Sequence, residues 1–348
     1  MKFKTSLSIF SATLLAAGSV FGQTVTDPVG FITLNVHGGG SVSTPKLSLL
    51  SPTLMRPILY QGVITNISTT TITVSGTPWA VGTFNGANGS HYVEIVSTAV
   101  PARSGTMSEI VSTPTSNTIV TAGDLSVNQA AVGDTICIRK DVTIADVFGA
   151  NNSAGLLGSA EDATTADEIL IYNASTSASY FYFTGIEGFP AGWYSSGDFS
   201  PANNVPIAPN EAVVIKRKAA GALAITSAGT VKTGNTVMAV VNGLNVLGTS
   251  SAAGITLANS GLMTGNDNTG VKAGEDGAVA DEVILYTTGN PVSYFYFTGA
   301  PPEFPAGWYK TDDFSNANNV SIAAGTAFVV KRKGGPSFNW ALPSPTSF

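Results

Sequence analysis

The chain contains one long segment twice, and this duplication restricts the folds that it can form. The two copies span residues 167–218 and 281–333, and more than half of their aligned positions are identical. The shared residues are mainly aromatic, small or turn-forming, each copy ends in Lys-Arg-Lys, and no catalytic set stands out among them. The duplication therefore predicts two homologous domains built on one scaffold.

The segments between the turns have the composition of short β-strands. Runs of Val, Ile, Thr, Tyr and Phe, bounded by Gly, Pro, Asn and Ser, recur along the chain, while helical periodicity is almost absent. We therefore predict a mainly all-β protein, in which a small β-barrel or sandwich precedes two tandem homologous β-domains, and a barrel is preferred. The expected ranges are 23–141 for the N-terminal domain, 142–226 and 227–336 for the two repeat domains, and 337–348 for an extended, proline-rich tail.

The first residues have the form of a secretory signal peptide. Lys2 and Lys4 are followed by an apolar core at residues 7–17 and by small residues up to Gly22. The apolar core is shorter than the roughly 20 residues of a membrane-spanning helix, and no later segment approaches that length. We expect cleavage of residues 1–22, export to the periplasm, the cell surface or the outside, and no transmembrane segment in the mature chain.

Composition argues against several classes of function. Removing residues 1–22 would change the formal net charge from −6 to −8, whereas nucleic-acid binding depends on basic side chains that neutralise phosphates. Cys137 is the only cysteine, so the chain cannot form an intramolecular disulfide, and with two histidines a His/Cys metal site is not expected. Cys137 lies in an alternating apolar run, which predicts a buried, inert thiol.

Aromatic residues that occur in both copies are the first candidates for a binding surface. Side chains alternate between the faces of a strand, so the Tyr-Phe-Tyr-Phe runs place rings on both faces. Such a strand is either buried on both sides, which is the favoured interpretation, or presents one face to sugar rings or to a protein partner. The candidate ligand or interface residues are Tyr180, Tyr182, Trp193, Tyr294, Tyr296 and Trp308.

Acidic residues at equal positions of the two copies are candidates for binding calcium, the only cofactor that the sequence suggests. Carboxylates could ligate calcium together with backbone and Asn oxygens, act as a catalytic pair, or cap turns by accepting hydrogen bonds from backbone N–H groups. Turn capping is favoured, and the duplication argues against catalysis because one active site rarely needs two complete copies. The candidates are Asp198, Asp313, Glu161, Asp162, Glu275 and Asp276.

The Lys-Arg-Lys triplets that close both copies have two interpretations. A charged triplet on an edge strand would block edge-to-edge pairing of sheets, and this interpretation is favoured. The alternative is a site for an anionic polymer or a lipid head group.

Several motifs occur in order along the mature chain: TDPVGF at residues 26–31, TIADVFG at residues 143–149, and the ADEILIY and YFYFTG segments of the first copy. With this combination the chain resembles a family of exported bacterial β-rich proteins that begin with a DPVGF motif after the signal peptide. The resemblance spans most of the mature chain. It implies export and a β-rich fold, and it carries no activity and no functional residues.

These features predict a non-enzymatic structural or adhesive protein of the cell surface or extracellular matrix, which assembles through β-sheet contacts. Its expected partners are further copies of itself, other cell-surface proteins or polysaccharide, and the N-terminal strand or the tail could add to a neighbour's sheet. The alternative is a carbohydrate-binding protein that uses the repeated Tyr and Trp residues. A hydrolase, a third hypothesis, would need a cleft that holds two acids free of turn roles.

Overall fold

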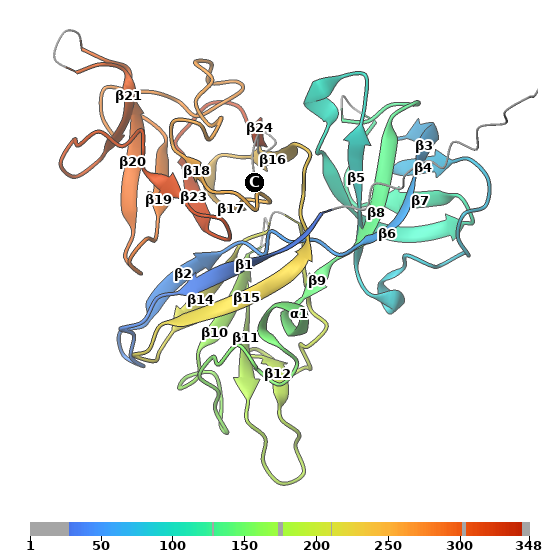
Figure 1. Ribbon diagram of the computed structural model, residues 1–348, viewed down its shortest axis with the longest axis horizontal. Coiled ribbons are helices and arrows are strands. Elements are labelled where there is room, and N and C mark those ends of the chain that lie inside the picture. Colours follow the sequence, from blue (N-terminus) through green and yellow to red (C-terminus); the bar gives the residue numbers. More distant parts are fainter. Residues whose placement is uncertain (1–27, 127–128, 173–176, 210, 301–303, 343–348) are drawn as a thin grey trace, which may run out of the picture.

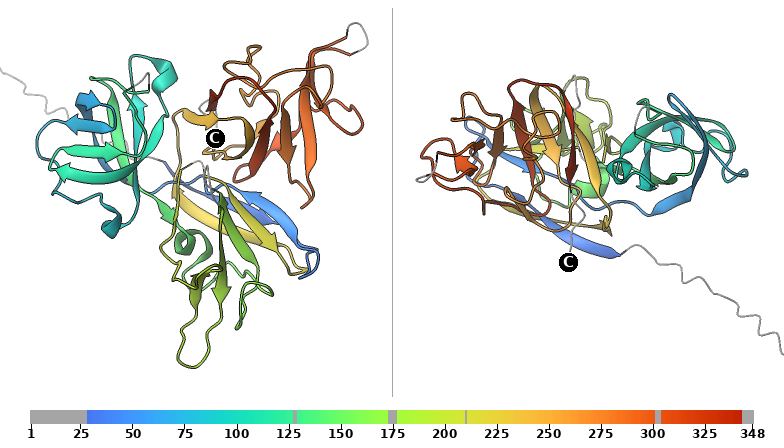
Figure 2. Two further views of the ribbon diagram at one scale, coloured as in Figure 1. Left: turned by 180° about the vertical axis from the view of Figure 1, so that it is seen from behind. Right: turned by 90° about the horizontal axis from the view of Figure 1, so that it is seen from above.

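The computed structural model describes residues 28–126, 129–172, 177–209, 211–300 and 304–342. Strands make up 45% and helices 4% of the structure, which confirms the prediction of an all-β fold. A six-stranded barrel lies to one side of two sheet-containing units (Figure 1, Figure 2). The predicted signal peptide, residues 1–22, lies outside the described residues.

The barrel is closed, as preferred from the sequence. Alternate side chains of its strands, such as those of Ile64, Ile72 and Ile119, point into a core of buried aliphatic and aromatic residues. Closure pairs every strand on both sides, so the barrel has no open sheet edge. In their order around the barrel, the strands are β3 (Ile58–Ser68), β4 (Thr71–Val74), β7 (Thr118–Thr121), β6 (Met107–Thr115), β5 (His91–Ser97) and β8 (Thr135–Lys140).

The first copy of the duplicated segment lies in unit 1, which has a five-stranded antiparallel sheet. A two-stranded ribbon and a short helix cover one face of this sheet, and the layers enclose a core that contains Leu34, Phe148 and Trp193. The sheet order is β12 (Gly192–Ser195), β11 (Ser177–Phe183), β10 (Glu168–Tyr172), β14 (Val213–Arg217) and β2 (Lys46–Leu50). The remaining elements are the ribbon strands β1 (Val29–Val36) and β15 (Leu223–Thr230), the short pair β9 (Val142–Thr143) and β13 (Pro206–Ile207), and helix α1 (Ile144–Phe148).

Unit 2 repeats this arrangement strand for strand. Its sheet order is β21 (Gly307–Lys310), β20 (Val292–Phe297), β19 (Glu282–Leu285), β23 (Ala327–Arg332) and β17 (Gly243–Gly248). Its ribbon consists of β16 (Thr236–Val240) and β24 (Phe338–Leu342), and its short pair of β18 (Ile255–Thr256) and β22 (Ser321–Ile322). By position, β1 and β2 of unit 1 therefore correspond to β16 and β17 of unit 2.

The structure does not have the predicted N-terminal domain of residues 23–141. Strand β1 pairs with β15 and β2 pairs with β14, so both belong to unit 1 rather than to the barrel. The barrel, residues 58–140, is an insertion between β2 and β9 of unit 1. The duplication therefore begins at the first described strand, upstream of the similarity that the sequence alone reveals.

The predicted extended tail, residues 337–348, is also partly wrong. Its first residues form β24, which pairs with β16 and buries Phe338, Trp340 and Leu342 in the core of unit 2. Because alternate residues of this short strand are apolar, one face enters the core while the proline residues lie further along. Residues 343–348 lie outside the described residues.

The two units contact each other through the same positions of their sheets. Ala212 and Val214 of unit 1 correspond to Ala327 and Val329 of unit 2, and all four lie in one buried apolar cluster with residues of β2, β10, β17 and β19. A contact in which both partners use one surface is the arrangement of a twofold homodimer. Here the contact forms between two units of one chain, so this surface of each unit is covered by the other unit.

Candidate functional site

The aromatic candidates lie in the cores of the two units. Trp193 and Trp308 are 1% and 2% exposed, and the Trp193 indole donates a hydrogen bond to the Gly149 carbonyl at 2.8 Å. Tyr182 packs edge-on against Trp193, and Tyr296 packs in the same way against Trp308. Tyr180 is half-buried and Tyr294 is buried, and both pack against the core of their unit. These residues stabilise the scaffold, and neither Trp offers a platform to a ligand.

The opposite face of the same strands is buried as well. Phe181 and Phe183 pack with Tyr194 and Phe199 in unit 1, and the equivalent side chains form a matching cluster in unit 2. Phe199 adopts a left-handed conformation with φ of 59°, which turns its ring back over the sheet. The Phe face of each strand is therefore buried, and the Tyr face is buried only in part against the core of its unit.

The calcium candidates form turns instead of a metal site. Asp198 accepts hydrogen bonds from the backbone and hydroxyl of Ser200 at 3.1 and 2.7 Å, and Asp313 is bonded in the same way by Ser315. The hydrogen bonds from Ser315 hold the pKa of Asp313 at about 2, so this carboxylate is ionised at neutral pH.

The acids of the two connecting loops behave similarly. Asp162 and Asp276 cap turns through backbone N–H groups two residues ahead, and the neighbouring Glu161 and Glu275 are exposed. Within the described part of the chain, no three His, Cys, Asp or Glu side chains are grouped so that they could hold a metal ion. The four aspartates therefore cap turns, as favoured from the sequence, and none of the six acids is grouped with others in a metal site.

Replacing Asp198 or Asp313 by Ala should lower the melting temperature of the protein by about 2–4 °C, because a turn N–H group loses its acceptor. The decrease should be equal with calcium and with a chelator in differential scanning calorimetry. Asp312→Ala, which removes an exposed neighbour, is the control and should have little effect. A melting temperature that rises with calcium in the wild type but not in Asp313→Ala would contradict the turn role.

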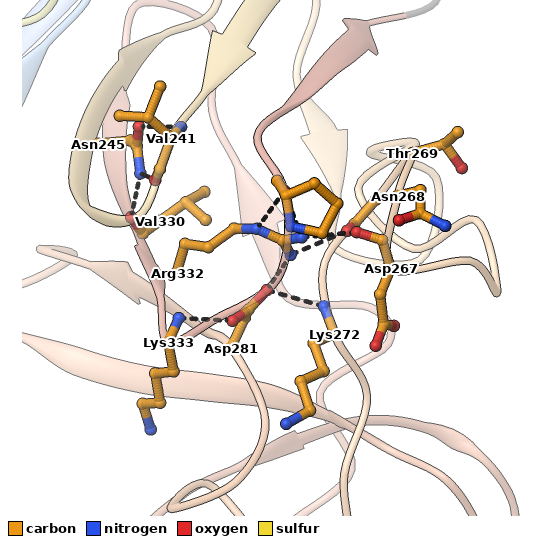
Figure 3. A network of polar contacts seen from close by, with 12 residues as sticks. Val241, Asn245, Asp267, Asn268, Thr269, Lys272, Asp281, Val330, Arg332 and Lys333 are labelled. Carbon is orange, nitrogen blue, oxygen red and sulfur yellow. Dashed lines mark hydrogen bonds and ion pairs between the residues drawn. The ribbon is translucent and has the colours of Figure 1, made fainter.

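The acids that open the duplicated segments and the triplets that close them form buried ion networks (Figure 3). Asp281 accepts hydrogen bonds from the Arg332 guanidinium at 2.6 Å and from the backbone N–H groups of Lys333 and Lys272, both at 2.8 Å. Arg332 also donates to the Asp267 carbonyl at 2.5 Å and lies over the Phe338 ring. In unit 1, Asp167 pairs with Arg217 in the same way.

The outer lysines of each triplet are neutralised by the second acid of the pair. Glu168 contacts Lys216 at 2.9 Å and Lys218 at 2.6 Å, and Glu282 makes the equivalent contacts in unit 2. The triplets lie on β14 and β23, which are interior strands of their sheets. The edge-protection interpretation is therefore wrong. Strands β2 and β17 pair with the outer sides of β14 and β23, and the sequence near the triplets does not reveal these distant pairings.

A cluster of polar residues at the junction of the barrel and unit 1 was not among the predicted sites. Glu109 on β6 and Asp141 after β8 bring their carboxyl groups together, and the Ser90 hydroxyl donates to Glu109 at 2.9 Å. Burial, with the neighbouring Asp141 charge second, raises the pKa of Glu109 to about 8, and burial raises the pKa of Asp141 to about 6. At neutral pH the pair therefore holds one proton.

Asp141 lines a cleft of about 560 Å³ between the barrel and unit 1. Residues 86–90 of the barrel form one wall, and Thr143, Asn204 and Pro206 of unit 1 form the other. A third acid, Glu211, has its pKa raised to about 7 by burial and adds to the negative charge around Glu109 and Asp141. Sequence analysis missed this group because its members come from separate strands and neither copy of the duplication contains Glu109 or Asp141.

The chain matches no family model, no curated protein and no solved structure. In the described residues, no helix is long and apolar enough to cross a membrane. The resemblance to proteins with a DPVGF motif stays a prediction.

Proposed function

We propose that this chain is an exported, non-enzymatic structural or adhesive protein of the cell surface or extracellular matrix, which assembles through β-sheet contacts. One observation carries the proposal: Asp281, Arg332 and Asp313, which have equivalents in unit 1, are bonded to partners within their own unit. Asp281 and Arg332 neutralise each other in the core, and Asp313 caps a turn. Duplication has therefore preserved a scaffold, and function belongs to its outer surface.

The outer face of the ribbon β1–β15 supports self-association. Phe31 is 76% exposed and Val29 is 78% exposed at its start. Thr33 and Asn35 lie opposite Thr226 and Ala224 on the same face, which carries no charge. Flat, uncharged β-surfaces pack against one another when copies meet.

The outer edges of β12 and β21 are less accessible to a partner. The turns at residues 198–200 and 313–315 lead the chain over the outer edges of β12 and β21, because Tyr194 bridges to Pro201 and Tyr309 to Asn316. The barrel is closed and the shared surface of the two units is used within the chain. We therefore assign the contact between copies to the ribbon face.

Phe31→Lys should shift the purified mature protein from assemblies toward monomers, because it places a charge in the uncharged contact between ribbon faces. Light scattering after size-exclusion chromatography, with electron microscopy of the same fractions, measures this change. Leu244→Lys is the matched control, since Leu244 is 68% exposed on β17 of unit 2 and is not part of the ribbon. Discrete monomers of the wild type under all conditions, with or without calcium, would contradict the proposal.

The two other hypotheses have less support. Carbohydrate binding through the repeated Tyr and Trp residues would need exposed rings, and Trp193 and Trp308 are buried. A glycosidase would need two carboxyl groups separated by about 5 Å or more, whereas Glu109 and Asp141 are in contact.

A further inference from the structure

A buried ion pair connects the barrel to the segment that joins the two units. The Lys232 ammonium, between β15 and β16, contacts the carboxylate of Glu94 on β5 of the barrel, and their side chains are 2% and 5% exposed. The surrounding contact is close: the Val237 backbone N–H donates to the Gly105 carbonyl at 3.1 Å. A side chain at Gly105 would collide with the Asn235 carbonyl. The barrel and this segment therefore fit closely together around the Lys232 ammonium and the Glu94 carboxylate.

The charged form of the Lys232–Glu94 pair has few hydrogen-bond partners for its ammonium group. An ammonium group has three protons to donate, and among the described residues Lys232 has no acceptor besides the Glu94 carboxylate. Burial lowers the pKa of Lys232 to about 7. Transfer of one proton from the ammonium to the carboxylate would convert the pair into a neutral amine and a carboxylic acid.

We propose that Lys232 and Glu94 condense to an amide that covalently links the barrel to the segment between the units. The Lys232 nitrogen attacks Cδ of Glu94, a C–N bond forms, and one carboxyl oxygen leaves as water with one proton from the acid and one from the amine. The step needs no oxidant, reductant or cofactor. Fixed geometry at a buried site replaces a bimolecular encounter, which lowers the entropic part of the barrier to this condensation.

Two neighbouring groups suit the reaction. The Cys137 thiol lies 3.7 Å from the second oxygen of Glu94 and donates toward it. Arg139 lines one pocket together with Glu94 and Lys232, and its positive charge would stabilise the oxygen of the tetrahedral intermediate. Cys137 is buried, as predicted. Since a single cysteine allows no intramolecular disulfide, an amide is the covalent link available to this exported chain.

Mass spectrometry of the intact, denatured protein tests the proposal. The wild type should be lighter than its linear chain by one water molecule, and a proteolytic digest should contain a branched peptide that joins Lys232 to Glu94. Lys232→Arg keeps the positive charge but cannot form this amide, and its mass should equal that of the linear chain. Lys218→Arg is the matched control, because Lys218 is buried beside Glu168 but donates to two acceptors, and it should still lose water.

A wild-type mass equal to that of the linear chain would overturn the proposal and leave a simple ion pair. A mass deficit that persists in Lys232→Arg would also overturn it, because the water would then come from another site. The wild-type measurement decides the question even if the variant does not fold, and neither result depends on whether the protein assembles.

Discussion

Replacing Asp281 by Asn is expected to destabilise unit 2 by about 3–5 kcal/mol, because it leaves the Arg332 charge buried without its counterion. Both side chains are fully buried, so water cannot replace the lost partner. Urea unfolding followed by tryptophan fluorescence measures the effect. The chain has one tryptophan in the barrel, one in unit 1 and two, Trp308 and Trp340, in unit 2.

Two controls distinguish this pair from ordinary surface charges. Asp312→Asn removes an exposed partner of Lys310 and should cost no more than about 0.5 kcal/mol. Asp167→Asn, the equivalent change in unit 1, should cost about as much as Asp281→Asn because Arg217 is also buried. A loss below about 1 kcal/mol for Asp281→Asn would show that Arg332 finds sufficient acceptors among the surrounding carbonyls.

Raising the pH from about 5 to about 9 should weaken the contact between the barrel and unit 1 by about 2–4 kcal/mol. The folded-state pKa of Glu109 is about 8 and that of Asp141 about 6, both above the values of exposed carboxyl groups. The stability that the protonated Glu109 and Asp141 carboxyl groups give to this contact is therefore fully present below about pH 4. It is lost as the pH rises through about 6 and then about 8. Glu211, with a pKa of about 7, acts in the same direction.

Thermal unfolding of the wild type and of Glu109→Gln across this pH range tests the expectation. The amide keeps an acceptor for Ser90 but removes the second negative charge beside Asp141, so the variant should lose less stability at high pH. Glu187→Gln, in an exposed hairpin turn, is the control and should follow the wild type. Parallel pH profiles of the wild type and Glu109→Gln would show that the pair does not control this contact.

Local chemistry accounts for the parts of the fold that could be predicted. Thr143 caps α1 by accepting from the Asp146 backbone while Asp146 bonds back to Thr143, a pattern set by residues three positions apart. The favoured turn role of Asp198 also depends only on residues nearby in sequence. Burial of Trp193 and of the Phe face of the Tyr-Phe-Tyr-Phe strand follows from the apolar character of these side chains.

The candidate sites were predicted less well because their members meet through distant pairings. Glu109 and Asp141 lie on separate segments, and the pairing of β5 with both β6 and β8 brings them into contact. Lys232 reaches Glu94 across more than one hundred residues. Neither pair has a spacing that periodicity or a motif could identify.

The sequence by itself determined an all-β chain with two copies of one scaffold, since strand composition, turn residues and the duplication are local or self-similar features. Only the tertiary structure decided that β1 and β2 complete unit 1, that the barrel is inserted between β2 and β9, and that the two units share one interface. The physical reason is that alternation along a strand specifies which face is buried, whereas the backbone hydrogen-bonding groups at its edges are alike in every strand and do not specify its neighbour.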